Sequence, residues 1–453
     1  MRAPVAKNEQ IELDILDLGS AGEGVGRYEG YALFVPGALA GERVRVRVVK
    51  AGKSFGFGRL EEILRSSPQR TSPPCPYFGR CGGCALQHLS YDGQLAYKRK
   101  LVADCFSKIA GEGDVIVAPT LGMENAWRYR NKAAYPVALR DGRPVLGLYA
   151  RRSHMVVDIA DCLIQSEKSA AALEKVRQFV TRYGILPYDE TSHRGLLRHV
   201  VVRTSGAGEV MATLVVNGQR LPREGELTAM LRDVPGMVSI TLNQNRRRGN
   251  VILGEEERVL WGEGFLRDTI GPFSFQVSAR SFFQVNPFQT ERLYEAAVDA
   301  AGLTGSETVL ELYCGVGSIT SFLAQRACRV VGVEYSQAAV EDARRSAKEN
   351  GVDATFIAGD AGQVLRDLQG KLLPDVVVLD PPRKGCDAAV LHRVADMGPK
   401  RVVYVSCEPG TLARDAALLR ELGYAAAFVR PIDMFPQTPG VECVALFERA
   451  AAT

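Results

Sequence analysis

The chain has 453 residues, a formal net charge of +4 and a hydrophobic content of 46%. This length exceeds one typical domain, so we expect two or three, and the small net charge excludes a uniformly basic nucleic-acid binder. The start of the chain lacks a basic-then-apolar signal pattern, and no apolar run approaches the ~20 residues of a membrane helix. We therefore expect a cytoplasmic protein without a membrane partner, in which ten cysteines indicate metal binding or catalysis more than disulfides.

Residues 1–66 show the alternation of short antiparallel strands with glycine-rich connections, which predicts a small five-stranded barrel. Between Arg43 and Leu60 there are basic side chains and no acidic one, with Phe55 and Phe57 among them. This composition is typical of a surface that binds phosphates and stacks bases, although a solvated barrel face gives the same pattern. We predict RNA contacts from three side chains of one strand, Arg43, Arg45 and Arg47.

A proline-rich linker over 66–74 leads into three closely spaced cysteines with Gly82 and Gly83 between the last two. Such spacing lets the backbone fold around one centre, and a distant fourth ligand is common for thiolate-bound metals. The spacing alone is compatible with zinc or with an iron–sulfur cluster. The predicted ligands are Cys75, Cys81, Cys84 and Cys162.

Residues 75–270 are predicted to form a central α+β domain that carries this metal site. A helix over 91–110 has an apolar face, with Lys98 placed off that face, and we expect the helix to pack on a neighbouring domain. Basic clusters with adjacent aromatic residues recur here, such as Arg130 beside Tyr129. We interpret them as an RNA-facing module, although a single cluster is more often solvated surface.

Strands and helices alternate over 272–453, which is the pattern of a doubly wound parallel sheet and predicts an α/β, Rossmann-like domain. One strand leads into Gly315-Val-Gly317 and a helix start, and the next strand ends in Glu334. Glycines let a ligand approach the backbone, and the carboxylate can accept hydrogen bonds from ribose hydroxyls. This predicts a nucleoside cofactor, and a dinucleotide is disfavoured because Thr320 replaces the third glycine of G-x-G-x-x-G.

Asp360 and Asp380 follow two further strands, and a fifth strand over 402–406 ends at Cys407 before Pro409. A thiol at the carboxyl end of a buried parallel strand lies where open α/β sheets bind ligands, which suits a nucleophile. A free cysteine is also one of the most frequently buried residue types, so this position alone does not separate a nucleophile from a core residue.

Four motifs together resemble those of class I S-adenosylmethionine-dependent RNA (uracil-5-)-methyltransferases, and the resemblance covers nearly the whole chain. The motifs are Phe282-Phe-Gln-Val-Asn286, Glu311-Leu-Tyr-Cys-Gly-Val-Gly317, Asp380-Pro-Pro-Arg383 and Ser406-Cys-Glu-Pro409. The resemblance implies an N-terminal TRAM domain of the OB type and S-adenosylmethionine as cofactor. It also implies a [4Fe–4S] cluster, because the four predicted metal ligands match those of the 23S rRNA methyltransferase branch.

The resemblance further implies that Cys407 is the nucleophile and Glu442 the general base, and we expect Arg383 to contact the target base or its phosphate. Many relatives have histidine where this chain has Gln437 and Gly440. Pattern and resemblance together predict seven cofactor contacts: Gln284, Tyr313, Gly315, Gly317, Glu334, Asp360 and Asp380.

These residue types fit the chemistry of uracil, whose C5 needs a thiolate on C6 before it accepts a methyl group, and then a base that removes the C5 proton. We predict a monomeric enzyme that methylates a uridine of 23S rRNA. tRNA is the alternative target, because both reactions use the same catalytic residues. A non-catalytic RNA-binding protein, an Asp-Pro-Pro amino-methyltransferase and radical S-adenosylmethionine chemistry are the other hypotheses; the last usually uses C-x3-C-x2-C, which differs from the spacing here.

Overall fold

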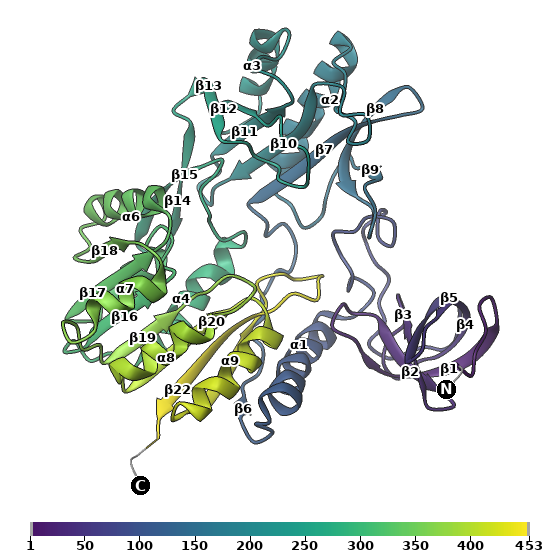
Figure 1. Cartoon of the computed structure of the whole chain (residues 1–453). Helices are drawn as coiled ribbons and strands as arrows, with labels where there is room; N and C mark the ends of the chain where they lie inside the picture. The colour runs from purple at the N-terminus through teal and green to yellow at the C-terminus, as the bar shows by residue number, and fades with distance from the viewer. Residues whose placement is uncertain (1–2, 451–453) are drawn as a thin grey trace.

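The structure, a computed structural model, describes residues 3–450. Its N-terminal part is the expected closed five-stranded barrel, with strand order β1-β2-β3-β5-β4 (Figure 1). Alternate valine, leucine and isoleucine side chains point inward and form the barrel core. The strands are β1 (Gln10–Leu18), β2 (Gly24–Tyr28), β3 (Tyr31–Val35), β4 (Arg43–Ala51) and β5 (Phe55–Arg65).

The segment between the barrel and the central sheet packs on the C-terminal sheet. Helix α1 (Tyr91–Cys105), capped by the Ser90 hydroxyl, continues as a π-helical turn (Phe106–Ala110). Its Val102 and Phe106 are buried in the core of the C-terminal sheet. Short strand β6 (Ile116–Val117) then pairs in parallel with β21 (Tyr424–Ile432) at the edge of that sheet. In Figure 1, α1 accordingly lies between the purple barrel and the yellow C-terminal elements.

The central part is a seven-stranded sheet with the order β13-β12-β11-β10-β7-β8-β9. Strands β10 and β11 are buried along their whole length, and helices α2 (Glu167–Tyr183) and α3 (Glu224–Arg232) pack on the sheet. The strands are β7 (Lys132–Arg140), β8 (Arg143–Tyr149), β9 (Val156–Asp158), β10 (Leu197–Thr204), β11 (Val210–Val216), β12 (Met237–Gln244) and β13 (Glu256–Gly262). A hairpin of β14 (Phe265–Ile270) and β15 (Phe273–Ser278) leads from this sheet into the C-terminal one.

The C-terminal part is an eight-stranded sheet with the order β18-β17-β16-β19-β20-β22-β21-β6, in which β16 to β20 are parallel. This confirms the predicted Rossmann-like α/β domain. Its remaining strands are β16 (Thr308–Leu312), β17 (Arg329–Glu334), β18 (Thr355–Ala358), β19 (Val376–Leu379), β20 (Arg401–Ser406) and β22 (Glu442–Arg449). Its helices are α4 (Pro287–Ala301), α5 (Ser318–Ala324), α6 (Gln337–Glu349), α7 (Ala361–Leu368), α8 (Ala388–Met397) and α9 (Pro409–Glu421).

The strand order changes direction between β16 and β19, which is the topological switch point where open α/β sheets bind their ligands. The chain segments that follow β16, β19 and β20 therefore meet at one edge of the sheet. Antiparallel β22 contributes its first residue to the same edge. In the part of the chain that the structure describes, no helix is both long and apolar enough to cross a bilayer.

Candidate active site at the carboxyl edge of the sheet

Cys407 and Glu442 lie next to each other because of the register between β20 and β22. Ser406 pairs with Cys443, so the residues that follow and precede them, Cys407 and Glu442, come together at the end of the ladder. Pro409 begins α9 directly after the thiol and stops the strand. The sheet thus brings the predicted nucleophile and the predicted base together from segments far apart in the sequence.

The charges around this pair affect both groups. Burial and the neighbouring Asp380 raise the pKa of Glu442 to about 8, and Arg383 opposes this shift. Burial and then Glu442 raise the pKa of the Cys407 thiol to about 11, whereas Arg383 lowers it. Burial also raises the pKa of Asp380 to about 7. Burial and the two carboxyl groups therefore favour the neutral thiol, and Arg383 is the neighbour that favours the thiolate.

The loop that carries Arg383 is held by α9. The Cys386 backbone N–H donates to the buried Asp415 carboxylate at 2.8 Å, and the Thr411 hydroxyl donates to the Arg383 carbonyl at 3.2 Å. Arg383 is itself exposed, so the loop presents its guanidinium to solvent near Cys407 and Glu442.

The glycine turn after β16 has the backbone geometry of a nucleoside site. Tyr313 adopts a left-handed φ of 66°, which is uncommon for a non-glycine residue. Gly315 has a φ of 55°, and a Cβ there would meet no atom within 4 Å, so its open side is available to a ligand. Gly317 caps α5, and a Cβ there would meet the Phe356 ring at 2.9 Å.

Glu334 at the end of β17 turns back onto this loop. Its carboxylate accepts from the Gly315 backbone N–H at 3.2 Å and from the Ser336 N–H at 2.8 Å. The loop and the predicted ribose acceptor therefore form one unit. Asp360, by contrast, caps α7 by accepting from the Gln363 N–H at 3.1 Å, so its carboxylate also has a structural role.

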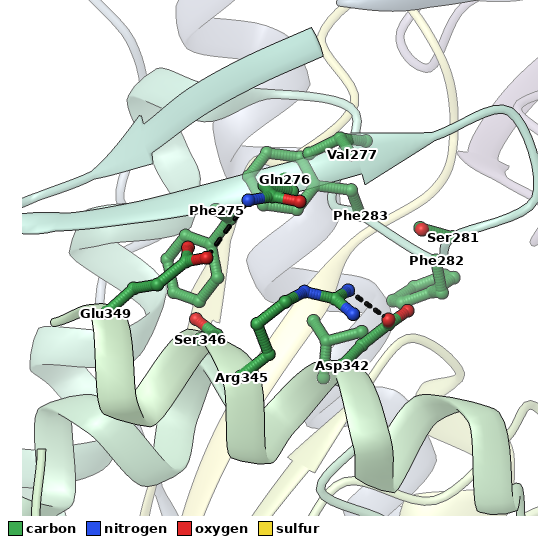
Figure 2. Close-up of a pocket in the computed structure, with 11 residues that line it drawn as sticks. Phe275, Gln276, Val277, Ser281, Phe282, Phe283, Asp342, Arg345, Ser346 and Glu349 are labelled. Atoms are coloured by element: carbon green, nitrogen blue, oxygen red, sulfur yellow. Dashed lines mark hydrogen bonds and ion pairs between the residues drawn. The ribbon is translucent and has the colours of Figure 1, made fainter. Parts of the chain in front are cut away.

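Gln284 lies in the segment between β15 and α4, and its carbonyl accepts from the Asn131 side chain at 3.0 Å. Figure 2 shows the cleft between β15 and α6 next to this segment, which is also lined by Val316 of the glycine turn. Gln276 donates to Glu349 at 3.0 Å across the cleft. This contact ties β15, the strand before the Gln284 segment, to the helix that follows Glu334.

The four predicted metal ligands line one pocket of mainly apolar character together with Leu148, Ile159 and Ile164. This group, Cys75, Cys81, Cys84 and Cys162, is called the cysteine pocket below. Burial raises the pKa of Cys84 to about 12, and the other three thiols add to this shift, so they lie within electrostatic reach of it. Within residues 3–450, no three or more His, Cys, Asp and Glu side chains are arranged to hold a metal ion.

The predicted RNA contacts on the barrel have acidic neighbours that the local sequence did not reveal. Arg43 and Arg45 both contact Glu12 on β1, at 3.1 and 3.2 Å, and Arg47 contacts Glu61 on β5 at 2.6 Å. The absence of acidic residues from 43 to 60 therefore did not predict the charge of this face, because the neighbouring strands supply it. These three side chains, Arg43, Arg45 and Arg47, are called the barrel arginines below.

A second face of the barrel combines aromatic rings with a cation. Phe34, Phe55 and Phe57 pack against one another in edge-to-face and tilted arrangements with centroid distances of 5.6 to 5.8 Å, and this group is called the aromatic patch. Arg152 of the central part lies 5.8 Å above the Phe57 ring, and Phe55 is 48% exposed. Rings with an adjacent guanidinium suit base stacking. The other predicted RNA contact, Arg130, is half-buried, and its Nε is a buried atom without a hydrogen-bond partner.

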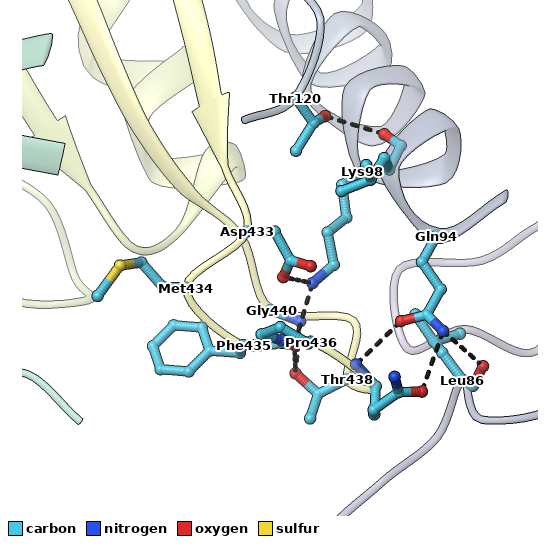
Figure 3. A network of polar contacts seen from close by, with 12 residues as sticks. Leu86, Gln94, Lys98, Thr120, Asp433, Met434, Phe435, Pro436, Thr438 and Gly440 are labelled. Atoms are coloured by element: carbon cyan, nitrogen blue, oxygen red, sulfur yellow. Dashed lines mark hydrogen bonds and ion pairs between the residues drawn. The ribbon is translucent and has the colours of Figure 1, made fainter. Parts of the chain in front are cut away.

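Sequence reasoning missed the polar contacts behind the predicted catalytic pair, Cys407 and Glu442. Residues 433–441, called the base loop, connect β21 with Glu442. Lys98 of α1 is fully buried against Asp433 at the start of this loop, although the helix pattern placed it off the buried face (Figure 3). Its spacing from Gln94 and Val102, four residues on either side, was the available signal, because such residues share one face of a helix.

The chain matches known protein families and relatives along its length. Residues 4–60 match the TRAM domain, and residues 263–450 match the tRNA (Uracil-5-)-methyltransferase family. An uncharacterized RNA methyltransferase of Halalkalibacterium halodurans is 48% identical over 452 residues, which covers 99% of this chain and 98% of that protein. One of Listeria innocua is 47% identical over 441 residues and covers 97% of both chains.

A solved structure is similar along the whole chain. The Pyrococcus abyssi tRNA (uracil-54, C5)-methyltransferase in complex with S-adenosyl-L-homocysteine matches with a TM-score of 0.77 and 29% sequence identity. The match covers 96% of this chain and 100% of that one.

Proposed function

This chain belongs to the S-adenosylmethionine-dependent RNA (uracil-5-)-methyltransferases, and from that premise we propose that it methylates C5 of one uridine in 23S rRNA. Family membership, the α/β fold with its TRAM barrel, the enzyme class and the cofactor S-adenosylmethionine are thereby confirmed. The target RNA, the mechanism and the cluster are our proposals.

The observation that supports the mechanism is the convergence of Cys407, Glu442 and Arg383 at the carboxyl edge of the sheet, next to its switch point. Cys407 reacts as its thiolate, after its proton has passed to solvent: the sulfur bonds to C6 of the uracil, and the π electron pair of the C5–C6 double bond moves onto C5 and the adjacent C4 carbonyl. Arg383 assists because its positive charge favours the thiolate. S-adenosylmethionine, when bound, supplies the methyl group that C5 receives.

Glu442 then removes the C5 proton, and the electron pair of the C5–H bond re-forms the double bond while the Cys407 sulfur leaves as a thiolate. The enzyme returns to its starting state after the proton passes from Glu442 to solvent. Its pKa of about 8 suits this role, because a general base works best when its pKa lies near the operating pH. Asp380, whose negative charge raises that pKa, keeps the carboxylate basic.

The cofactor contacts proposed from the sequence surround this edge. Tyr313, Gly315 and Gly317 form the turn on which the nucleoside would lie, and Glu334 would accept from its ribose hydroxyls. Gln284, Asp360 and Asp380 complete the set, with Asp380 nearest to the reacting groups.

We also propose that the cysteine pocket holds a [4Fe–4S] cluster. Four thiols converge in one apolar pocket, which fits a group bound entirely by thiolates. A zinc ion would hold all four sulfur atoms at about 2.3 Å from one centre, whereas a cluster keeps them farther apart because each binds a different iron atom. Such a cluster would fix the fold around Cys84.

The proposal of 23S rRNA rests on the resemblance of these four cysteines to those of the 23S rRNA branch. tRNA remains the second candidate, because the P. abyssi enzyme of similar structure acts on tRNA. On the RNA side, we propose the aromatic patch with Arg152 as the stacking surface, Arg130 and Arg383 as contacts nearer the active site, and the barrel arginines as weaker contacts because carboxylates already pair with them.

The test is methylation of unmodified 23S rRNA and of unmodified tRNA by the anaerobically purified protein, followed by nuclease digestion and mass spectrometry. We expect 5-methyluridine at one position of 23S rRNA and none in tRNA. Methylation of tRNA alone would contradict the proposed target, and a methyl group on an exocyclic nitrogen would contradict the mechanism.

A further inference from the structure

The base loop ends at Glu442, so whatever holds this loop also holds the proposed general base. Glu442 is the first residue of β22 and is 4% exposed. Three consecutive residues of the base loop, Phe435, Pro436 and Gln437, precede it by five to seven positions. The backbone carbonyls of all three accept hydrogen bonds from outside the C-terminal sheet. The loop that leads into Glu442 is therefore held from the N-terminal half of the chain, while strand pairing holds Glu442 itself.

Helix α1 provides the first set of these contacts (Figure 3). Lys98 pairs with Asp433 and donates to the Phe435 carbonyl at 3.0 Å. The side-chain amide of Gln94 bonds to Gln437 twice: its oxygen accepts from the Gln437 backbone N–H at 2.9 Å, and its nitrogen donates to the Gln437 side-chain oxygen at 3.1 Å. Gln94 is 1% exposed, so no water replaces these bonds if they are lost.

The cysteine pocket provides the second set. Ala85 and Leu86, the two residues after Cys84, both donate their backbone N–H to the Gln437 carbonyl at 3.0 Å. Gln94 closes the connection, because its nitrogen also donates to the Leu86 carbonyl at 3.2 Å. A short path of hydrogen bonds thus runs from Cys84 through Leu86 and Gln437 to the loop before Glu442.

Two further features indicate that the base loop is held at Gln437. Gln437 adopts a left-handed φ of 69°, a backbone conformation that is uncommon for a residue with a side chain. Tyr129 donates its hydroxyl to the Pro436 carbonyl at 2.9 Å and is close enough to Cys84 for that thiol to affect its pKa, which burial raises. The backbone after Cys84 and the Tyr129 hydroxyl therefore both hold the base loop.

We propose that Gln94 and Gln437 are positioning residues that join the cysteine pocket to the general base. The inference rests on the proposed function in which Glu442 removes the C5 proton. In this view, loss of order after Cys84 frees the Gln437 carbonyl, displaces Glu442 and slows proton removal, while addition of Cys407 to the uracil continues. A damaged cysteine pocket would therefore leave the enzyme attached to its RNA.

The experiment uses the full-length, anaerobically purified protein and two variants that change the contacts between Gln94 and Gln437 in different ways. Gln94→Met keeps the volume of the side chain and removes all of its hydrogen bonds. Gln437→Gly removes one bond and suits the left-handed backbone, so this variant is expected to fold even if the first does not. The matched control is Asn243→Ala, which removes a buried amide of the central sheet that donates to the Gly254 carbonyl at 3.2 Å.

Two measurements are made on each variant: hydrogen exchange of the peptide over 433–442, and the rate at which the covalent protein–RNA adduct is released during turnover. We expect faster exchange and roughly 10- to 100-fold slower release for Gln94→Met, a smaller effect for Gln437→Gly, and no change for the control. Cys84→Ser should raise exchange over 433–442 as Gln94→Met does.

Exchange and release at wild-type values in both Gln94→Met and Gln437→Gly would overturn the inference, as would equal slowing in the control. The exchange measurement does not depend on the catalytic role of Glu442. A failure of Glu442→Gln to accumulate adduct would therefore count against the proposed function. Unchanged exchange in Gln94→Met and Gln437→Gly would count against the positioning role of these two residues.

Discussion

The buried ion pair between Lys98 and Asp433 provides a quantitative test of how α1 holds the base loop. Both side chains are 0% exposed, and Tyr91 donates to the second Asp433 oxygen at 2.9 Å. Lys98→Met leaves a buried carboxylate with one neutral partner, and removing one member of a buried pair costs about 3–5 kcal/mol. Lys98→Met with Asp433→Asn removes both charges and keeps a partner for Tyr91, so it should cost less than Lys98→Met alone, with a coupling of about 2 kcal/mol.

The stability of the single Asp433→Asn variant should depend on pH. Burial lowers the pKa of Lys98, and Asp433 opposes this shift in the wild-type protein. Without Asp433, the folded state holds the Lys98 proton less tightly than the unfolded state. The pKa of Lys98 is then lower in the folded state, so stability rises as pH increases toward the unfolded value, and the cost of Asp433→Asn should be smaller at pH 9 than at pH 7.

The assay is hydrogen exchange of the peptides over α1 and the base loop at increasing denaturant, which gives a local opening free energy in a chain of several domains. Lys100→Met is the control on the same helix, because its ion pairs with Asp17 and Asp104 are half-exposed and worth less than about 1 kcal/mol. A loss below about 1 kcal/mol for Lys98→Met, or additive losses in the double variant, would refute the reasoning.

Three further predictions concern the base, the RNA surface and the metal. Glu442 acts only when ionised, so release of the covalent adduct should accelerate as pH rises toward the Glu442 pKa of about 8 and level off above it, and a flat profile would assign the proton to another group. Replacing Phe55 and Phe57 by alanine should weaken RNA binding by about 1–3 kcal/mol per lost base stack. This loss should exceed the loss on replacing the barrel arginines, and a larger loss for the arginines would count against the aromatic patch. The protein purified without air should be brown and contain iron, Cys162→Ser should lose this iron while Cys105→Ser keeps it, and stoichiometric zinc without iron would contradict the cluster.

Local motifs allowed much of the C-terminal fold to be predicted. A β-strand followed by Gly315-Val-Gly317 and a helix start is read within a dozen residues, and a parallel sheet then brings Cys407 to the edge near that turn. The proximity of Cys407 to Glu442 could come only from the resemblance, because the register of β20 with β22 joins segments that no local pattern relates.

Other features depend on contacts that sequence patterns do not carry. The barrel arginines look unpaired along the chain, but strand pairing places Glu12 and Glu61 beside them. In the sequence, Lys98 has the pattern of a surface cation, and only the fold places Asp433 of the base loop against it. Strand β6 is only two residues long and lies far in the sequence from its partner β21, so neither length nor periodicity indicated it.

The central claim, that Cys407 attacks and Glu442 removes the C5 proton, is tested most directly by trapping the covalent intermediate. Glu442→Gln incubated with unmodified 23S rRNA and S-adenosylmethionine should accumulate a methylated protein–RNA adduct that survives denaturing electrophoresis, because the sulfur can add but cannot leave. The adduct should be absent from Cys407→Ala and from the double variant. Rapid turnover by Glu442→Gln without adduct, or an adduct in Cys407→Ala, would contradict the account.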